Sequence, residues 1–192
     1  MEDKELHINR KEFREIVIGQ NQNENIIVSI CELGFCIIAK RPISKGERIF
    51  SFAGPIIDFL ETKRRGEQEC MPVQTGDNLY IDTEAPWKYI NHSCEPNAGI
   101  RNNSDLIALE DIPLHAEIRF DYSTTMDENS FTMECKCGKP SCRKVVTDFR
   151  LLPRDIQERY FELGIVMDFI RKKYEMDPYT QHLISIKLQK VR

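Results

Sequence analysis

Three closely spaced cysteines in this chain have the pattern of a metal site. Cys135, Cys137 and Cys142 form a Cys-x-Cys-x4-Cys motif on one short segment. Structural zinc takes four tetrahedral ligands, and in many sites all four are cysteine thiolates. Three local thiolates therefore leave one ligand to be supplied by a residue elsewhere in the chain.

Cys94 is the natural candidate for that fourth ligand, and His92 or Asp121 is a weaker variant. The remaining cysteines fall in expected strands or a helix: Cys31, Cys36 and Cys70. The total of seven cysteines is odd, which argues against a complete disulfide framework. The charged N-terminus lacks the apolar stretch of a signal peptide, so we expect an intracellular protein, in which clustered cysteines more often bind metal. The ordinary alternative is four buried or free thiols.

Two further groups of polar residues come before these cysteines. The stretch Tyr89-Ile90-Asn91-His92-Ser93-Cys94-Glu95-Pro96-Asn97 contains an Asn-His pair, and Phe120-Asp121-Tyr122 follows it. A lone histidine is more often a hydrogen-bonded core residue, and a tyrosine that ends an apolar strand more often packs in the core. The order of both groups and the cysteines, however, resembles one family, the SET-domain protein lysine methyltransferases.

This resemblance covers roughly residues 25–146 and implies a fold class. The expected fold is mainly β (α+β), with several short sheets and a C-terminal pseudoknot in which the Asp-Tyr segment threads beneath the Asn-His loop. In the family, three post-SET cysteines join the cysteine of the Asn-His-Ser-Cys motif around one structural Zn2+. The resemblance therefore implies a zinc site with four ligands: Cys94, Cys135, Cys137 and Cys142.

The family uses S-adenosylmethionine (SAM) as methyl donor, and the resemblance implies which residues bind it. The Asn-His pair contacts SAM in the family, which points to Asn91 and His92 here. A glycine-containing cofactor loop matches Gly34-Phe35-Cys36, although its second glycine is replaced by Cys36, whose thiol adds bulk. Lys88 stands where the family often has arginine and is also expected to face SAM.

Tyr122 matches the family's catalytic tyrosine, whose phenol points into a channel where lysine meets the methyl group. The expected channel residues are Phe52, Tyr80 and Phe120. At the position of Phe120 the family uses Phe or Tyr to set the product, and a phenol there would hold a water and restrict a methylated amine. Phenylalanine therefore predicts di- or trimethylation. Before Tyr122, His115-Ala116-Glu117-Ile118 replaces the family's Gly-Glu-Glu-Leu, which affects the turn more than the chemistry.

Short apolar segments separated by turn residues predict the strands that position these groups. A polar helix is expected over 59–69, and after Pro153 the apolar spacing becomes helical, with Gly164 separating two short helices. Asp177-Pro178 predicts the start of a last helix. The expected strands cover 26–30, 35–39, 48–52, 79–81, 98–101, 106–109 and 117–120.

The same reading divides the chain into four parts. We expect an N-terminal extension over 1–24, a SET domain over 25–125, a post-SET zinc loop over 126–149 and a helical segment over 150–192. No linker rich in Gly, Ser or Pro separates the helical segment, so it is expected to pack on the core.

Composition and charge narrow the choice of partners. The chain has 192 residues with 41% hydrophobic and 30% charged, and no apolar run approaches the roughly 20 residues that span a bilayer. The formal net charge is −4, with the acidic excess before residue 150. An acidic body favours a basic partner and disfavours direct nucleic-acid binding. The expected partner is a protein with an accessible lysine, such as a histone or another basic protein.

Together these features predict a SAM-dependent protein lysine N-methyltransferase. One alternative is a catalytically inactive SET fold, stabilised by zinc, that serves as a protein-binding module; the departures at Cys36 and at His115-Ala116 motivate it. Another is a redox-sensing protein, which rests on the cysteine count alone.

Overall fold

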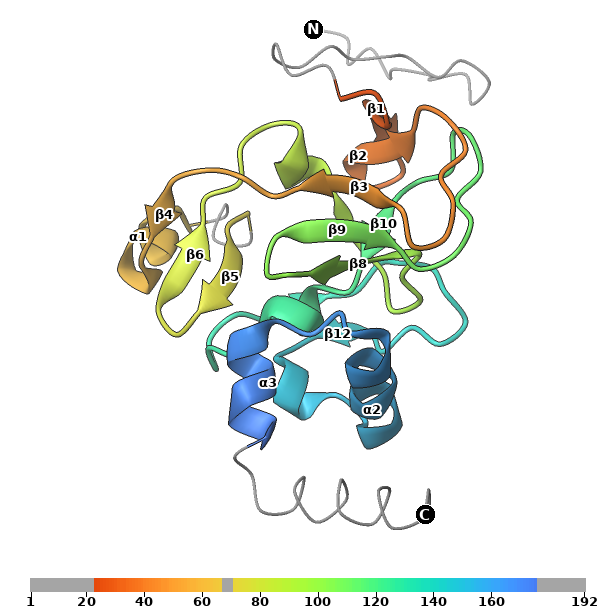
Figure 1. Ribbon diagram of the computed structural model, residues 1–192. Coiled ribbons are helices and arrows are strands. Elements are labelled where there is room, and N and C mark those ends of the chain that lie inside the picture. Colours follow the sequence, from red (N-terminus) through yellow and green to blue (C-terminus); the bar gives the residue numbers. More distant parts are fainter. Residues whose placement is uncertain (1–22, 67–70, 176–192) are drawn as a thin grey trace, which may run out of the picture.

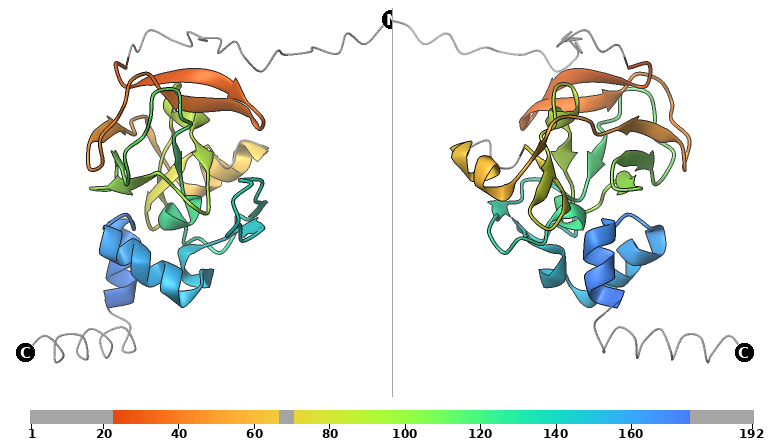
Figure 2. Two further views of the ribbon diagram at one scale, coloured as in Figure 1. Left: turned by 90° about the vertical axis from the view of Figure 1, so that its right-hand side faces the viewer. Right: turned by 60° about the vertical axis from the view of Figure 1, so that its left-hand side comes forward.

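The computed structural model describes residues 23–66 and 71–175, and short strands dominate this part of the chain. Helices α2 and α3 lie together at one end of the molecule, below the strands in Figure 1, and the two further views of Figure 2 agree. The elements in chain order are β1 Ile26–Cys31, β2 Gly34–Ala39, β3 Arg48–Ser51, β4 Ile56–Ile57, α1 Phe59–Arg64, β5 Val73–Gly76, β6 Leu79–Ile81, η2 Trp87–Tyr89, β7 Asn91–His92, β8 Ala98–Arg101, β9 Asp105–Ala108, β10 Arg119–Phe120, η3 Tyr122–Thr125, β11 Met133–Glu134, β12 Val145–Val146, η4 Phe149–Leu151, α2 Arg154–Leu163 and α3 Asp168–Glu175.

The described strands pair into five small sheets, so the fold is mainly β with few helices, as predicted. Two sheets have three strands, in the orders β3-β9-β8 and β4-β6-β5, and three sheets have two, namely β1-β2, β7-β10 and β11-β12. Small sheets cannot bury a large core alone, so several of them share one main core, while the β11-β12 sheet packs in a second, smaller cluster with the cysteines. The largest fully buried side chains of the main core include Ile37, Ile43, Ile49, Ile100, Leu106, Ile112 and Ile118.

The hairpin of β1 and β2 forms one edge of the fold. Its register runs from Ile26 opposite Ala39 to Cys31 opposite Gly34, whose φ of +97° suits glycine at the tight turn. A disulfide joins Cys31 to Cys36 across this hairpin, a bond that the sequence did not predict.

Strands β7 and β10 bring the two polar segments of the sequence together. They pair in parallel, with Arg119 opposite Asn91 and Phe120 opposite His92. The backbone N–H of Ser93 also donates to the Phe120 carbonyl oxygen at 3.0 Å. The Asn-His pair and the segment that ends at Tyr122 therefore lie side by side at the centre of the molecule.

The two C-terminal helices are separated by Gly164, as the sequence predicted. This residue ends α2 with a left-handed φ of +66°, and its N–H donates back to carbonyls of the last turn. The apolar side chains that follow enter the main core, and Ile165 packs so closely on Gly99 of β8 that a β-carbon there would lie 2.5 Å from Ile165 Cγ2. The helical end and the sheets therefore share one core.

The ends of most predicted strands agree with the structure within one or two residues, and the elements that differ are short. The predicted strand over 117–120 is reduced to two residues of β10, and the polar helix ends at Arg64. Strands β4, β5, β7, β11 and β12 were not predicted, because two to four residues carry too little alternation to recognise. The end of the predicted helix at 67–69, the helix opening at Asp177-Pro178 and nearly all of the extension over 1–24 lie outside the described residues.

Within the part of the chain that the structure describes, no helix combines the length and apolar character needed to cross a membrane.

Candidate active site

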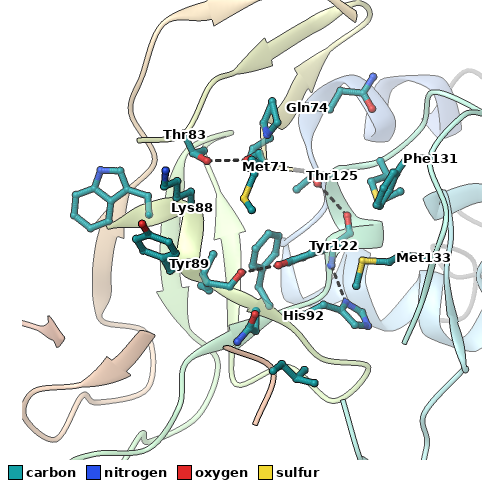
Figure 3. A pocket seen from close by; sticks show the side chains of 18 of the residues that line it. Met71, Gln74, Thr83, Lys88, Tyr89, His92, Tyr122, Thr125, Phe131 and Met133 are labelled. Atoms are coloured by element: carbon teal, nitrogen blue, oxygen red, sulfur yellow. Dashed lines mark hydrogen bonds between the residues drawn. The ribbon is translucent and has the colours of Figure 1, made fainter. Parts of the chain in front are cut away.

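A pocket of about 930 Å3 opens beside the pair of strands β7 and β10 (Figure 3). Its wall contains nearly all of the residues that the sequence assigned to SAM binding and to the lysine channel. They are Gly34, Phe35, Lys88, Asn91 and His92, together with Phe52, Tyr80, Phe120 and Tyr122. Segments far apart in the sequence therefore converge on one cavity.

Cys36 is the predicted cofactor-loop residue that the structure does not bring to this wall. Successive side chains of a strand point to opposite faces. Phe35 lines the pocket, and Cys36 is fully buried on the other side of β2, where it is bonded to Cys31. The bulk of its side chain is therefore directed away from the cavity.

Tyr122 lies at the centre of the pocket and is held at both ends (Figure 3). Its backbone N–H donates to His92 Nδ1 at 3.2 Å, and its hydroxyl donates to the Ile90 carbonyl oxygen at 2.6 Å. The Thr125 hydroxyl donates to the Tyr122 carbonyl at 3.0 Å and fixes the first turn of η3. Because the phenol proton is directed to Ile90, the phenol oxygen acts as an acceptor toward other groups.

Aromatic rings surround the phenol on one side. The ring centroids of Phe120 and Tyr122 are 4.9 Å apart, and those of Phe52 and Phe120 are 5.9 Å apart. Both phenylalanines are buried in the core. A cationic amine that entered this apolar space would lose hydration, which lowers its pKa and favours the neutral form.

Asn91 is oriented by two acceptors at the edge of the pocket. Its side-chain Nδ2 donates to Glu117 Oε1 at 2.9 Å and to the Phe35 carbonyl at 3.2 Å. Glu117 in turn pairs with Arg119, which donates to the Cys137 carbonyl at 3.1 Å. Glu117 is the one glutamate of the family's Gly-Glu-Glu-Leu that is kept in His115-Ala116-Glu117-Ile118, and the sequence predicted no role for it.

His92 is neutral in this environment. Burial is the main cause that lowers the pKa of its imidazole, to about 4. Since Nδ1 accepts the Tyr122 N–H, the ring proton is on Nε2, which lies 3.4 Å from Cys94 Sγ. This histidine therefore links the backbone of Tyr122 to the cysteine cluster.

The four cysteines predicted to bind zinc come together. The Sγ atoms of Cys94, Cys135, Cys137 and Cys142 all lie within 4.8 Å of one another, and the Cys94–Cys135 distance is 3.7 Å. A tetrahedral zinc with bonds of about 2.3 Å separates its sulfur ligands by about 3.8 Å, so the cluster fits that metal.

Backbone groups around the cluster favour a thiolate. Burial opposes ionisation of the Cys137 thiol, but backbone hydrogen bonds at Cys94 and Lys139 outweigh it and lower the pKa of this thiol to about 6. Burial raises the pKa of the Cys94 and Cys135 thiols. A bound cation would offset that cost, because metal ligation requires the deprotonated form.

Comparison with known proteins agrees with this geometry: residues 34–123 match the family model of the SET domain. This stretch of the chain is therefore similar to a SET domain. The chain is 30% identical over 130 residues to the variant-silencing SET domain-containing protein of Plasmodium falciparum, covering 57% of this chain and 5% of that protein. It is 28% identical over 131 residues to histone-lysine N-methyltransferase ash1 of Drosophila melanogaster, covering 59% of this chain and 6% of that protein.

A further relative and a solved structure extend the match. The H3 lysine-36 specific histone-lysine N-methyltransferase of Candida albicans is 28% identical over 148 residues, which cover 65% of this chain and 17% of that protein. The crystal structure of Arabidopsis thaliana SUVH6 in complex with SAM superposes with a TM-score of 0.53 at 19% identity, covering 64% of this chain and 32% of that one. The chain therefore spans only a small part of its curated relatives, and this solved structure supports the SET fold alone.

Asp121 lies within the residues that match the SET family model, and its partners lie beyond them. Its fully buried carboxylate accepts two hydrogen bonds from Arg143 Nη2, at 2.9 and 2.7 Å, and one from the Tyr160 hydroxyl at 2.8 Å. Arg143 directly follows Cys142, and Tyr160 lies on α2. The helical apolar spacing expected after Pro153 includes Tyr160, and Asp121 was considered only as a weaker metal ligand, so the sequence did not predict this cluster.

The wall of the pocket opposite Lys88 and Tyr89 was also missed (Figure 3). It includes Gln74 from β5 and, after the residues that match the SET family model, Glu128, Phe131 and Met133. The hydroxyl of Tyr80 on β6 donates to the Glu128 carboxylate, so the sheet that contains β5 and the segment after η3 are joined in this wall. Residues 126–134 form mostly irregular structure, so no periodicity in the sequence indicated them.

Proposed function

We propose that this chain is a SAM-dependent protein lysine N-methyltransferase. The observation that carries the proposal is the Tyr122 phenol, held by Ile90 at the centre of a pocket whose wall also contains Asn91 and buried aromatic rings. The names of relatives such as ash1 and the Candida albicans protein, both histone-lysine N-methyltransferases, support the same reaction.

The reaction is a direct displacement. The lone pair of a neutral lysine amine attacks the methyl carbon of SAM, the carbon–sulfur bond breaks, and the products are S-adenosylhomocysteine and a methylated ammonium that then releases a proton. A lysine with a pKa of about 10.4 is only about 0.1% neutral near pH 7.4, which costs about 4 kcal/mol. The apolar channel residues Phe52 and Phe120 and the positive sulfonium would both lower that pKa.

No residue needs to act as a covalent nucleophile, so alignment and electrostatics supply the catalysis. We assign Tyr122 the catalytic role: its phenol oxygen orients the amine and the departing methyl group. SAM would be held by Asn91 and His92, by the turn at Gly34-Phe35 and by Lys88, whereas Cys36 does not line the pocket.

We further propose that Cys94, Cys135, Cys137 and Cys142 bind a structural Zn2+. The bound ion would neutralise the thiolates and tie the loop that contains Cys137 to the segment that contains Asn91. Metal-binding free energy would thus become folding free energy for the loop that covers this end of the pocket.

The substrate that fits best is a histone or another basic protein with an accessible lysine. The net charge of −4, with its acidic excess before residue 150, favours a basic partner.

We propose that residues 25–125 supply the SET domain, 126–149 the zinc loop and 150–192 a helical segment. Phe120 in the channel leaves room for a methylated amine, so the expected products are di- and trimethyllysine.

The test is methyl transfer from isotope-labelled SAM to histones and to a lysine-rich protein mixture. We expect wild type to label discrete proteins and Tyr122→Phe to reduce labelling strongly, while Tyr174→Phe, on α3 and away from the pocket wall, retains it. Equal labelling by wild type and Tyr122→Phe would contradict the catalytic assignment. Folded, zinc-loaded protein that neither labels any substrate nor binds SAM would instead support the inactive protein-binding module.

A further inference from the structure

We infer that Tyr160 of α2 is a positioning residue for Tyr122 and acts through the buried carboxylate of Asp121. This inference rests on the proposed function, because it concerns the tyrosine to which we assign the chemistry. It gives the helical end of the chain, which lies outside the matched SET domain, a direct part in the active site.

The Asp121 carboxylate requires several donors because it is fully buried. An ionised carboxylate is costly to remove from water unless hydrogen bonds and an opposite charge compensate it. Arg143 supplies the charge, and the remaining donors are the Tyr160 hydroxyl at 2.8 Å and the Ser123 backbone N–H at 3.0 Å. Each donor therefore helps to fix where the carboxylate lies.

The position of Asp121 determines where Tyr122 begins its helical turn. Asp121 is the N-cap of η3, since its carboxylate accepts the Ser123 N–H and its carbonyl accepts the Thr124 N–H at 3.0 Å. Tyr122 is the first residue of that turn, and its own N–H is held by His92. A shift of the cap would therefore rotate the Tyr122 backbone and move the phenol away from Ile90.

Packing of the Tyr160 ring alone does not explain its hydroxyl. The side chain is 1% exposed and lies in the apolar core, where phenylalanine would fill nearly the same space without burying a polar group. Burial raises the pKa of this phenol well above its usual range, and the charge of Asp121 adds to the effect, so the group remains a hydrogen-bond donor. The hydroxyl donates to Asp121, and Arg143, which pairs with the same carboxylate, also lies beside it.

The deciding variant is Tyr160→Phe, which removes the hydroxyl and keeps the ring. The matched control is Phe161→Leu, the next residue of α2, whose ring packs on Phe149 and Tyr174. We expect Tyr160→Phe to lower kcat by roughly tenfold or more, with zinc content and SAM affinity retained. We expect Phe161→Leu to lower the unfolding temperature but to leave kcat unchanged.

A double-mutant cycle separates positioning from a general structural role. If Tyr160 acts through Tyr122, then adding Tyr160→Phe to Tyr122→Phe should cost little further activity. Equal fold-losses in the two backgrounds, or an equal kcat loss in Phe161→Leu, would overturn the inference.

A measurement without turnover keeps this inference distinct from the proposed function. With 13C-labelled tyrosine, the ring signal of Tyr122 is identified by its absence in Tyr122→Phe. We expect this signal to shift in Tyr160→Phe and to stay in place in Phe161→Leu. If the Tyr122 signal does not move in Tyr160→Phe, the inference is overturned, even when the enzyme is active. If the signal shifts but the protein transfers no methyl group, the positioning role is supported and only the proposed reaction is contradicted.

Discussion

The side-chain amide of Asn91 donates to Glu117 Oε1 at 2.9 Å, so a carboxylate two residues before β10 orients one edge of the pocket. We predict that Glu117→Ala weakens SAM binding by roughly tenfold, because a hydrogen bond to a charged group contributes about 1.5–3 kcal/mol. Isothermal titration calorimetry measures the change, and Glu110→Ala, an exposed glutamate, is the control. Unchanged affinity in Glu117→Ala would show that Asn91 needs no such partner.

A methyl group added at Gly99 should disturb the junction between β8 and the helical end. Its β-carbon would lie 2.5 Å from Ile165 Cγ2, and Ile165 is 1% exposed, so the side chain cannot move freely into solvent. Overpacking of this kind costs about 1–3 kcal/mol. We expect Gly99→Ala to lower the free energy of unfolding by that amount in urea titrations. A variant as stable as wild type would mean that α2 and α3 can readjust without cost.

Removal of zinc should loosen one loop before the whole fold. A chelator that strips the proposed ion leaves Cys94, Cys135, Cys137 and Cys142 without a shared partner, while the core of the sheet β3-β9-β8 is unaffected. We expect hydrogen exchange to accelerate over 133–146 and methyl transfer to fall, with little change in β8 and β9. Simultaneous loss of protection everywhere would instead make the metal a requirement for the entire fold.

The size of the channel should set the number of methyl groups. Phe120 is buried beside Tyr122, and a hydroxyl added there would retain a water in the space that a methylated amine needs. We predict di- and trimethyllysine from wild type and mainly monomethyllysine from Phe120→Tyr, as read by mass spectrometry of the modified substrate. A strictly monomethylating wild type would refute this prediction.

Lys173 should hold two walls of the pocket together from α3. Its Nζ pairs with Asp77, beside β5, at 2.6 Å and with Asp127, after η3, at 2.8 Å. Exposed ion pairs contribute about 0.2–1 kcal/mol each, so Lys173→Met should speed hydrogen exchange over 73–81 about fivefold. Lys172→Met, the adjacent lysine, is the control and should leave that exchange unchanged. Equal effects of the two variants would exclude a specific clamp.

The parts of the site that the sequence predicted are those with local patterns. The sequence alone shows the spacing of Cys135, Cys137 and Cys142 and the order of Asn91 and Tyr122. The structure brings these residues together around one cavity. The sequence could not predict that Asp121 would bind Tyr160, because a buried polar pair 39 residues apart has no period. A hydroxyl on an otherwise apolar helix face is the only signal that could have indicated it.

Other differences have equally physical causes. His115 replaces the glycine of the family's turn, yet it adopts a left-handed φ of +65°, and its N–H donates to the Ala39 carbonyl at 2.8 Å. The turn therefore keeps its shape at some conformational cost. Cys36 stands where the family has a glycine, but the alternation of side chains along a strand directs its thiol to the far face of β2. Comparison of motifs in the sequence does not show on which face of the strand this side chain lies.

The hydrogen bond between Tyr160 and Asp121 also has a consequence for synthesis of the chain. A ribosome that adds about 5–20 residues per second needs roughly 2–8 s to pass from Asp121 to Tyr160. During that interval the emerging polypeptide already contains Asn91, His92 and Tyr122 but lacks the donor that completes the cap. If the proposed activity holds, the emerging chain would therefore lack the hydrogen bond that positions Tyr122 until α2 has been synthesised.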